Sequence, residues 1–351
     1  MDSNALATQL YHDVTGSLRM YAVYLGERLG YYRALADGGP MTSTELAERT
    51  GTNERYTREW LEHQATCGFV GMDGNTVDSE RVFTLPQEHI PVLADRDHLL
   101  YGTQSTIDLV RVGRRLADLV DVYRTGAAPA PIPWEPEGRA VSNRAQFLNL
   151  LGQKWLPSIP DVHSRLSGGP ARVADIACGL GWSSIALALA YPRITVDGLD
   201  LDQKAIEAAA RNAEEAGVAD RVAFAAKNAA ELTSADPYDA VFIIEALHDM
   251  NNPVDALRTA RELLAPGGSV LVFDTKPGEE LASPGPLVEQ YEYGWSLVAC
   301  LPATMGDPAS AMTGTVMRPA TLRRYAEEAG FTDVTILPIE AETWRFYQLR
   351  G

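Results

Sequence analysis

The chain contains few cysteines, little positive charge and no long hydrophobic run, and each shortage argues against a class of protein. Its three cysteines, Cys67, Cys178 and Cys300, form no CxxC pair and no even-numbered disulfide framework, so we expect a reducing, cytoplasmic location. No apolar run approaches the roughly 20 residues that cross a bilayer, and the first residues lack the basic segment of a signal peptide. The net charge of −17 argues against broad neutralisation of nucleic-acid phosphates.

A proline-rich run divides the 351 residues into two parts. Residues 127–138, AAPAPIPWEPEG, contain four prolines. Because proline lacks a backbone donor and favours the extended polyproline II conformation, this run is typical of a linker. We therefore predict a mainly helical domain over residues 1–138, ending in the linker, and a second domain over residues 139–351.

The first domain shows the element order of a winged helix. A first helix is predicted by an apolar stripe at helical spacing: Leu18, Tyr21, Ala22 and Leu25. Two short helices follow, the first begun by a capping box at Thr42 and Glu45, the second capped by Asn53. Three side chains of the second are expected to point inward: Tyr56, Trp60 and Leu61. Residues 69–72 and 81–85 then indicate a hairpin around a turn at 73–75.

A winged helix can bind DNA, but the charge of this domain argues against that function. Residues 1–100 contain eight arginines and no lysine against fifteen acidic residues. The would-be recognition helix carries Glu54, Glu59 and Glu62, whose charge has the wrong sign for phosphate contacts. Because folds are reused without their function, we expect packing and dimerisation instead.

A later apolar stripe leaves two interpretations open. It lies on a long helix predicted over about residues 98–125, and its members are Leu116, Leu119, Val120 and Tyr123. Such a stripe suits packing against a partner subunit and packing within one chain equally well.

From residue 171 onward, strands alternate with helices. Strands are predicted at residues 172–177, 194–199, 221–225, 238–244 and 269–273, and helices at 183–190, 203–217, 253–264 and 319–330. This alternation predicts an α/β fold with a Rossmann-like, doubly wound, mostly parallel sheet. Residues 332–338 and 344–350 are expected to add a C-terminal antiparallel hairpin.

A glycine turn after the first of these strands, with an acid at the end of the next, predicts a site for a nucleoside-containing cofactor. Gly179 and Gly181 allow a ligand to approach the backbone closely. About twenty residues further on, Asp200 can accept hydrogen bonds from both hydroxyls of a ribose. The third glycine of a dinucleotide site is replaced by Ser184. Asp175 before the turn suits an amino-acid ammonium group better than a phosphate.

On these motifs the chain resembles the class I S-adenosylmethionine-dependent methyltransferases. Residues 175–181, DIACGLG, are similar to that family's first motif, with Ala177 where glycine is usual, and residues 224–229 are similar to its adenine-binding region, with Asn228 in place of the usual aspartate. The resemblance implies S-adenosyl-L-methionine as cofactor. The residues implied to hold it are Asp175, Ala177, Cys178, Gly179, Gly181, Asp200, Leu201, Asn228, Ala229 and Glu245.

The combination of the two domains adds to this resemblance. A winged helix joined to such a methyltransferase domain is similar to a bacterial group of small-molecule methyltransferases in which the N-terminal domain mediates dimerisation. A homodimer is therefore implied, with a small-molecule acceptor and with neither nucleic acid nor membrane as a partner.

His248, after the fourth strand, is the candidate general base. Open α/β sheets bind ligands at strand ends, and the pKa of histidine ordinarily lies near neutrality. A structural role, in which His248 only shapes the cofactor pocket, stays open with about equal weight. Asp249 is expected to orient His248 or to cap the next helix. Since no histidine belongs to an HxxxH motif or a His/Cys cluster, we expect no metal site.

Residues 276–318 form a connection long enough to be a lid or a binding segment. Five of its side chains are expected to line a pocket for a planar or apolar acceptor: Tyr291, Tyr293, Trp295, Met305 and Met312. Sealing of the gap between the two domains is an alternative of nearly equal weight.

These observations predict a methyltransferase that acts on an O, N or C atom of a small molecule. The alternative is a ligand-responsive winged-helix regulator that binds S-adenosylmethionine without turnover. In a third interpretation the protein binds S-adenosylmethionine but transfers no methyl group, and the positively charged sulfonium serves only as an electrostatic element.

Overall fold

The computed structural model describes residues 2–73, 80–130, 143–233 and 236–351, and the chain forms two compact units, Met1–Gly113 and Arg114–Gly351. The linker predicted at 127–138 lies mostly outside the described residues. The helix predicted over 98–125 is two helices: α6 (Gln104–Gly113) ends the first unit and α7 (Leu116–Thr125) lies in the second. Among the described residues, no helix combines the length and apolar character that a bilayer span requires.

The first unit is a winged helix. Its helices are α1 (Ser3–Leu29), α2 (Tyr31–Gly38), α3 (Ser43–Thr50), α4 (Glu54–Thr66), the 3₁₀ turn Gln87–His89, α5 (Ile90–Leu93) and α6. A small antiparallel sheet in the order β1-β3-β2 completes it, formed by β1 (Met41–Thr42), β2 (Gly71–Asp73) and β3 (Val82–Thr84). The turn predicted after Asp73 falls on residues outside the described ranges.

The predicted capping signals are present in this unit. The Thr42 hydroxyl accepts a hydrogen bond from the Glu45 backbone N–H, and the Glu45 carboxylate accepts one from the Thr42 N–H, which is a capping box. Asn53 caps α4. The prediction that Tyr56 points inward is wrong, because it is 79% exposed. Trp60 and Leu61 are buried as predicted, but the neighbouring Thr57 takes the buried position expected for Tyr56. Gln64, one turn further on, completes the buried face of α4.

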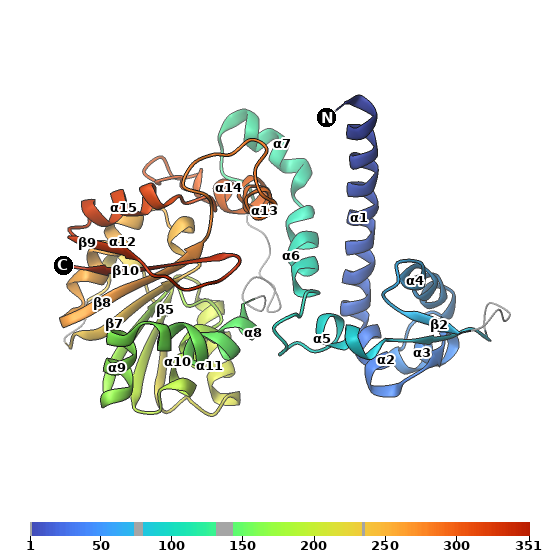
Figure 1. Ribbon diagram of the computed structural model, residues 1–351, viewed down its shortest axis with the longest axis horizontal. Coiled ribbons are helices and arrows are strands. Elements are labelled where there is room, and N and C mark those ends of the chain that lie inside the picture. The colour runs from blue at the N-terminus through green and yellow to red at the C-terminus, as the bar shows by residue number, and fades with distance from the viewer. Residues whose placement is uncertain (1, 74–79, 131–142, 234–235) are drawn as a thin grey trace. The chain divides into compact units, whose positions relative to one another are not determined.

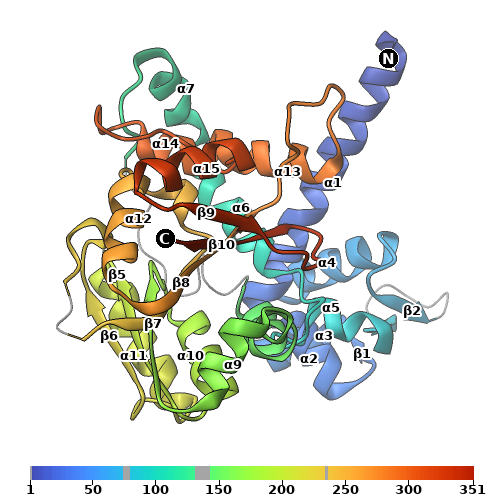
Figure 2. The ribbon, with the colours of Figure 1, turned by 60° about the vertical axis from the view of Figure 1, so that its left-hand side comes forward.

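The apolar stripe on α1 faces outward. Leu18, Tyr21 and Leu25 are each about half exposed, whereas the buried residues of this helix are Val23, Gly26 and Glu27. The N-terminal half of α1 extends past α2, α3 and α4 (Figures 1 and 2). A continuous apolar face is therefore left without cover within this unit.

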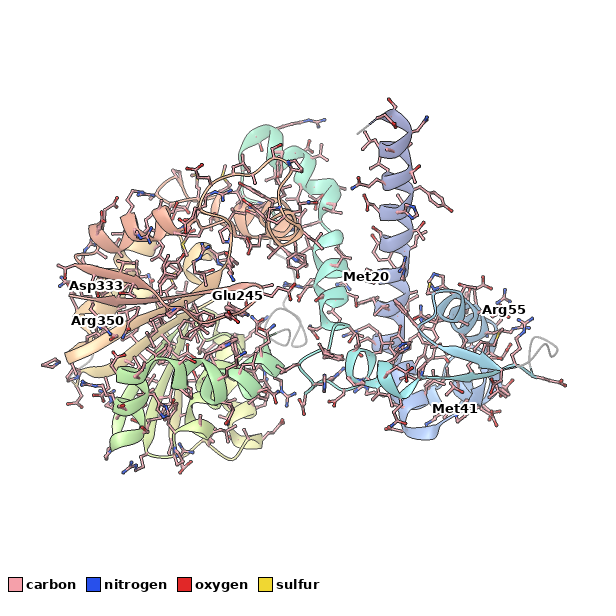
Figure 3. The ribbon with its side chains drawn as sticks, in the orientation of Figure 1. Met20, Met41, Arg55, Glu245, Asp333 and Arg350 are labelled. Carbon is pink, nitrogen blue, oxygen red and sulfur yellow. The ribbon has the colours of Figure 1, made fainter. Side chains whose placement is uncertain are left out.

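The second unit contains a seven-stranded sheet in the order β6-β5-β4-β7-β8-β10-β9. The strands are β4 (Ala171–Ile176), β5 (Ile194–Asp200), β6 (Val222–Ala226), β7 (Tyr238–Ile244), β8 (Leu264–Thr275), β9 (Asp333–Ile336) and β10 (Trp344–Arg350). The first five strands along the chain pair in parallel, while β10 runs antiparallel between β8 and β9. An ion pair of 3.6 Å between Arg350 and Asp333 links β9 and β10 (Figure 3). The predicted Rossmann-like sheet with an antiparallel hairpin is confirmed.

Helices cover both faces of this sheet (Figures 1 and 2). One face carries α9 (Pro160–Gly168), α10 (Trp182–Ala190) and α11 (Gln203–Glu215), and the other carries α12 (Pro253–Glu262) and α15 (Pro319–Glu328). Each face has its own buried core, one around Ile185 and Phe242, the other around Val241 and Leu257. Because the strand order reverses at β4, the carboxyl ends of β4, β5 and β7 meet where such sheets bind ligands.

Two segments depart from a simple alternation of strand and helix. Between paired positions Tyr238 and Ala240 of β7, strand β8 skips from Leu264 to Ser269, so residues 265–268 lie inside β8 as an irregularity. The predicted lid segment is partly helical: it contains α13 (Leu287–Trp295), a π-helical turn over Ser296–Cys300 and α14 (Leu301–Thr304). After α7 and before β4, α8 (Arg144–Gln146) leads into a π-helical stretch, Phe147–Trp155, and a 3₁₀ turn, Leu156–Ser158.

Candidate active site

The glycine turn after β4 and the acid at the end of β5 are joined directly. The Gly179 N–H donates to Oδ2 of Asp200 at 2.9 Å, and the Cys178 N–H donates to the Leu199 carbonyl at 3.1 Å. The other carboxylate oxygen of Asp200 accepts from the Asp202 N–H at 2.9 Å. Two motifs about twenty residues apart in sequence therefore form one site.

Left-handed backbone shapes this turn. Gly179 and Gly181 have φ of 53° and 79°, and Ala177 has φ of 59°, a conformation that favours glycine. A Cβ at Gly181 would lie 2.6 Å from the Phe224 ring, so only glycine fits there without displacement. The backbone itself thus explains why glycine is usual at the position of Ala177 in the motif that this turn resembles.

Asp175 lies beneath the turn and is buried. Its Oδ2 accepts hydrogen bonds of 2.6 Å from the hydroxyls of both Ser183 and Ser184, in the first turn of α10. Its Oδ1 is buried and has no hydrogen-bond partner in the described part of the chain. Burial raises the pKa of this carboxyl to about 6, against the two serine hydrogen bonds that lower it. Asp175 therefore braces the glycine turn against α10 and keeps one acceptor oxygen unused.

The region predicted to hold adenine lies after β5 and β6. Leu201, directly after Asp200, is 73% exposed. Asn228 uses its side chain locally: Oδ1 accepts from the Ala230 N–H at 3.1 Å, and Nδ2 donates to Glu231 at 3.0 Å. Asn228 thus caps the 3₁₀ turn Ala229–Glu231, a role that asparagine and aspartate share.

Glu245 directly follows β7 and has a left-handed conformation, with φ of 52°. Its N–H donates to the Phe273 carbonyl at 2.7 Å, and its exposed carboxylate accepts a hydrogen bond from the Asn143 side chain (Figure 3). Beside it, the Arg144 guanidinium stacks 4.4 Å from the ring centre of Trp182, the first residue of α10. The start of α8 is therefore held at the carboxyl edge of the sheet, next to the glycine turn.

His248 is buried in a 3₁₀ turn, Leu247–Asp249, that follows β7. Its Nδ1 lies 2.6 Å from Oδ1 of Asp274, and its Nε2 lies 3.4 Å from Oδ1 of Asp249. Burial lowers the pKa of the imidazole, but the two carboxylates and a hydrogen bond with Cys300 outweigh it and raise the pKa well above its usual value. His248 therefore has strong proton affinity and one fixed ring nitrogen.

Asp274 and Cys300 were not predicted as site residues. Asp274 is a fully buried acid at the end of β8, and β8 lies beside the strand that leads to His248. An acid closing the apolar run VLVF was a sequence signal for it. Cys300 lies in the π-helical turn of the lid segment, and a lone cysteine 52 residues after His248 gives no such signal.

Two side chains, one directly before α7 and one within it, support that π-helical turn. Arg115 donates to the carbonyls of Val298 and Ala299 at 2.8 and 3.3 Å, and the Tyr123 hydroxyl donates to the Leu297 carbonyl at 2.8 Å. These bonds satisfy carbonyls at the irregular turn and hold Cys300 in place.

The five residues predicted to line an acceptor pocket are distributed along the lid segment. Tyr291 and Trp295 contact each other on α13, with ring centres 6.0 Å apart, while the Tyr293 hydroxyl accepts from Arg318 at 3.3 Å. Met305 follows α14, and Met312 has a left-handed backbone with φ of 50°. A hollow of about 300 Å³ lies elsewhere, against Leu199, Phe224, Lys227 and Tyr238.

Comparison with known proteins agrees with this architecture. Residues 173–268 match the family described as a methyltransferase domain, and residues 18–95 match the Rv2258c-like winged HTH domain. A ubiquinone biosynthesis O-methyltransferase of Burkholderia pseudomallei is 31% identical over 205 residues, 58% of this chain and 79% of that protein. Trans-aconitate 2-methyltransferase of Streptomyces avermitilis is 32% identical over 146 residues, 40% of this chain and 51% of that protein.

Solved structures share the fold over nearly the whole chain. Mitomycin 7-O-methyltransferase has a TM-score of 0.68 at 22% identity, with 99% of this chain and 98% of that chain covered. Human N-acetylserotonin methyltransferase, solved with S-adenosylmethionine, has a TM-score of 0.73 at 16% identity, with 100% and 98% covered. At these identities the likeness concerns the fold.

The chain belongs to the class I S-adenosylmethionine-dependent methyltransferases. Within that class, it joins an Rv2258c-like winged N-terminal domain to the methyltransferase domain. The chain spans between 38% and 62% of the length of the first three curated relatives that it matches.

Proposed function

We propose that this protein transfers the methyl group of S-adenosylmethionine to a hydroxyl oxygen of a small, apolar or aromatic molecule. The observation that carries the proposal is His248, which follows β7 and is held by Asp274 of β8 at the same carboxyl edge of the sheet as the Gly179–Asp200 site. A hydroxyl acceptor must lose its proton, and a positioned histidine serves that need. Relatives named as O-methyltransferases support the choice of oxygen.

The cofactor fits the residues at the first half of the site. S-adenosylmethionine, when bound, supplies a methyl group activated by its sulfonium. Asp200 is partly exposed and can accept the ribose hydroxyls while it holds the Gly179 N–H, and exposed Leu201 can cover one face of the adenine. The unused, buried Oδ1 of Asp175 supports an attraction for the ammonium group. Because the side chain of Asn228 is used in capping, we assign the contact with adenine to the next residue, Ala229.

His248 then handles the acceptor proton. Because its pKa is raised, His248 must first release the proton on Nε2, and the neutral imidazole, whose Nδ1–H donates to Asp274, then presents the lone pair of Nε2. The acceptor O–H would give its proton to Nε2 as its oxygen takes the methyl group, while the carbon–sulfur bond of the donor breaks and S-adenosylhomocysteine leaves. The Asp274 carboxylate would stabilise the imidazolium that forms. Glu245 contributes through its backbone and its hydrogen bond with Asn143, so we assign it to shaping the cofactor edge.

The activity test combines an acceptor screen with a His248 variant. With hydroxylated aromatic acceptors, we expect release of S-adenosylhomocysteine by the wild type. His248→Gln should lower kcat by about 100-fold or more, the usual contribution of a general base, while calorimetry shows an unchanged Kd for the donor. Absence of turnover with every acceptor class despite tight donor binding would favour the regulator. Unchanged kcat in His248→Gln would remove His248 from the mechanism.

The winged helix does not serve DNA in this proposal. Three ion pairs occupy arginines on and beside α4: Arg55–Glu59, Arg58–Glu54 and Arg81–Glu62 (Figure 3 labels Arg55). These arginines are paired with acids on the same surface, so the positive charge that phosphate binding needs is already neutralised. A mobility-shift assay at low salt, with and without the donor, should show no complex with duplex DNA.

A homodimer formed through α1 explains its exposed apolar face. The members of this face are Leu6, Leu10, Val14, Leu18, Tyr21 and Leu25, at spacings of three or four residues and each 47–59% exposed. An isolated helix half is only marginally stable in water, and burial of such a face against a second copy provides the missing packing. On α7, Leu116 and Val120 are also about half exposed and can face a partner subunit. Leu119 is buried and the Tyr123 hydroxyl donates to Leu297, so the other half of that stripe packs within the chain.

Sedimentation measurements test the dimer. The double variant Leu10→Lys and Leu18→Lys should be monomeric, because it places charges in the apolar face. His12→Lys adds a charge nearly opposite on the same helix, given 100° per residue, and should leave the dimer intact. A wild type that sediments as a monomer would contradict the proposal. The cytoplasmic location stays a prediction.

A further inference from the structure

We propose that His248, Asp249 and Cys300 form a three-ligand site for a divalent, thiophilic cation, with Zn²⁺ as its first candidate, and that occupancy of this site inhibits the enzyme. The imidazole, the carboxylate and the thiol each offer one ligand atom, and these atoms lie within 4.8 Å of one another. Nitrogen, oxygen and sulfur together are a ligand set that zinc accepts.

The spacing of two of the ligand atoms, the histidine nitrogen and the carboxylate oxygen, suits a tetrahedral ion. Zinc binds imidazole nitrogen and carboxylate oxygen at about 2.0–2.2 Å, so two such atoms on a tetrahedral ion lie roughly 3.3 Å apart. The observed separation of Nε2 of His248 and Oδ1 of Asp249 is 3.4 Å. That distance is long for a hydrogen bond and close to the distance that a shared metal ion would impose.

Asp274 prepares His248 as a ligand. Histidines that bind metals usually donate their other ring N–H to a carboxylate, which fixes the tautomer and the ring plane. The 2.6 Å contact between Nδ1 of His248 and Asp274 is such a carboxylate–histidine pair, and it directs Nε2 towards the proposed ion. The cluster is reachable, because the Asp249 side chain is 21% exposed and Cys300 is partly exposed.

Three protein ligands leave the fourth position of a tetrahedral ion open, for water or for an acceptor oxygen. The consequence for activity rests on the proposed function: Nε2 is the atom that takes the acceptor proton, and a nitrogen bound to a metal cannot take it. Zinc is therefore expected to inhibit methyl transfer reversibly, through the thiol supplied by the lid segment.

Binding is tested on the full-length protein with Zn²⁺ alone, by competition with a metal-sensitive dye, and with Co²⁺, whose thiolate complexes absorb light strongly. We expect one equivalent per chain and a sulfur-to-cobalt band. Cys300→Ser should lose the band. It should also weaken zinc binding by more than about 100-fold, because loss of a residue that only positions a ligand already costs about 10–100-fold. Asp274→Asn should retain the band, with zinc affinity lowered by about 10–100-fold.

Cys67→Ser is the matched control, because Cys67 Sγ lies 3.8 Å from His63 Nε2 and is the other thiol beside a histidine in the described chain. It should bind zinc as the wild type does. Loss of the bound zinc in Cys67→Ser would overturn the proposal, and so would wild-type-like binding by Cys300→Ser that retains its donor affinity.

Activity gives a separate readout. Zinc should lower wild-type turnover at least tenfold, a chelator should restore it, and Cys300→Ser should resist. Equal inhibition of both proteins would overturn the inhibitory role. Because the dye and cobalt measurements need no turnover, they report on the site even if the proposed methyl transfer fails.

Discussion

The two ends of the candidate active site are built in different ways. At the cofactor end, neighbouring stretches of chain meet through the backbone, as in the bond from the Gly179 N–H to Asp200. At the acceptor end, three side chains from distant segments converge: His248 after β7, Asp274 on β8 and Cys300 in the lid segment. The first end is defined by backbone conformation, and the second by side-chain contacts.

Because of this difference, the two ends should tolerate different amino-acid substitutions. A backbone-defined site depends on φ angles and on close approach, as at Gly181 beneath Phe224. A site formed by converging side chains depends on contacts between buried polar groups, such as the contact of the Asp274 carboxylate with the His248 imidazole. Substitutions at the two ends should therefore change different measured quantities, donor affinity at one and turnover at the other.

Asp274→Asn is expected to have the largest effect. An amide still accepts from the Thr275 N–H, which Asp274 now does at 2.8 Å, but it cannot stabilise an imidazolium at His248. We expect kcat to fall by about 1,000-fold, within the range that loss of general-base function causes, with the donor Kd nearly unchanged. A parallel loss of donor affinity would show that the two ends are not separable.

Asp200→Ala should lower the affinity for the methyl donor. It removes the acceptor of the proposed ribose hydroxyls, worth about 1.5–3 kcal/mol for each hydrogen bond to a charged group, so calorimetry should show donor affinity lowered by about 100-fold. The control is Asp202→Asn, two residues away, because asparagine retains the cap of α11. Equal donor affinity in Asp200→Ala and wild type would contradict the cofactor assignment.

Asp175→Asn tests the cost of the buried acid between the glycine turn and α10. Its folded-state pKa of about 6 lies above the ordinary 3.8, so its contribution to stability is present below about pH 4 and is lost as the pH rises through 6. At pH 7.5 the variant should be more stable than wild type by on the order of 2 kcal/mol, a difference that shrinks towards pH 4.5. Chemical denaturation at both pH values measures it.

The reverse order of stability at pH 7.5 would mean that the hydrogen bonds from Ser183 and Ser184 outweigh the burial of the charge. Such a result would leave the structural role of Asp175 in place and remove its predicted pH dependence.

Ala177→Gly should have the smallest effect, in the direction of greater stability. Glycine relieves the left-handed strain at φ of 59°, about 1–2 kcal/mol, but loses more backbone entropy on folding, so the net gain is about 1 kcal/mol or less. Ala186→Gly, inside α10, should instead destabilise by about 1 kcal/mol or more. Thermal denaturation of both variants decides whether the turn is strained.

Much of the fold could be predicted because its signals are local. The Thr42–Glu45 capping box, the Asn53 cap and the alternation after residue 171 are properties of neighbouring residues. Predictions failed where a long-range contact decided the outcome. Tyr56 carries an apolar ring at a suitable spacing, yet Thr57 takes the buried position. The helix over 98–125 is interrupted at the boundary between the units.

The amino-acid order alone determined the sheet, its hairpin and the glycine turn with its partner Asp200, since each depends on residues close together along the chain and on backbone preferences that those residues carry. Only the tertiary structure decided the partners of His248. Asp274 and Cys300 lie 26 and 52 positions away, and nothing local to them encodes their convergence. It arises because β7 and β8 pair in parallel and because α7 holds the π-helical turn against them.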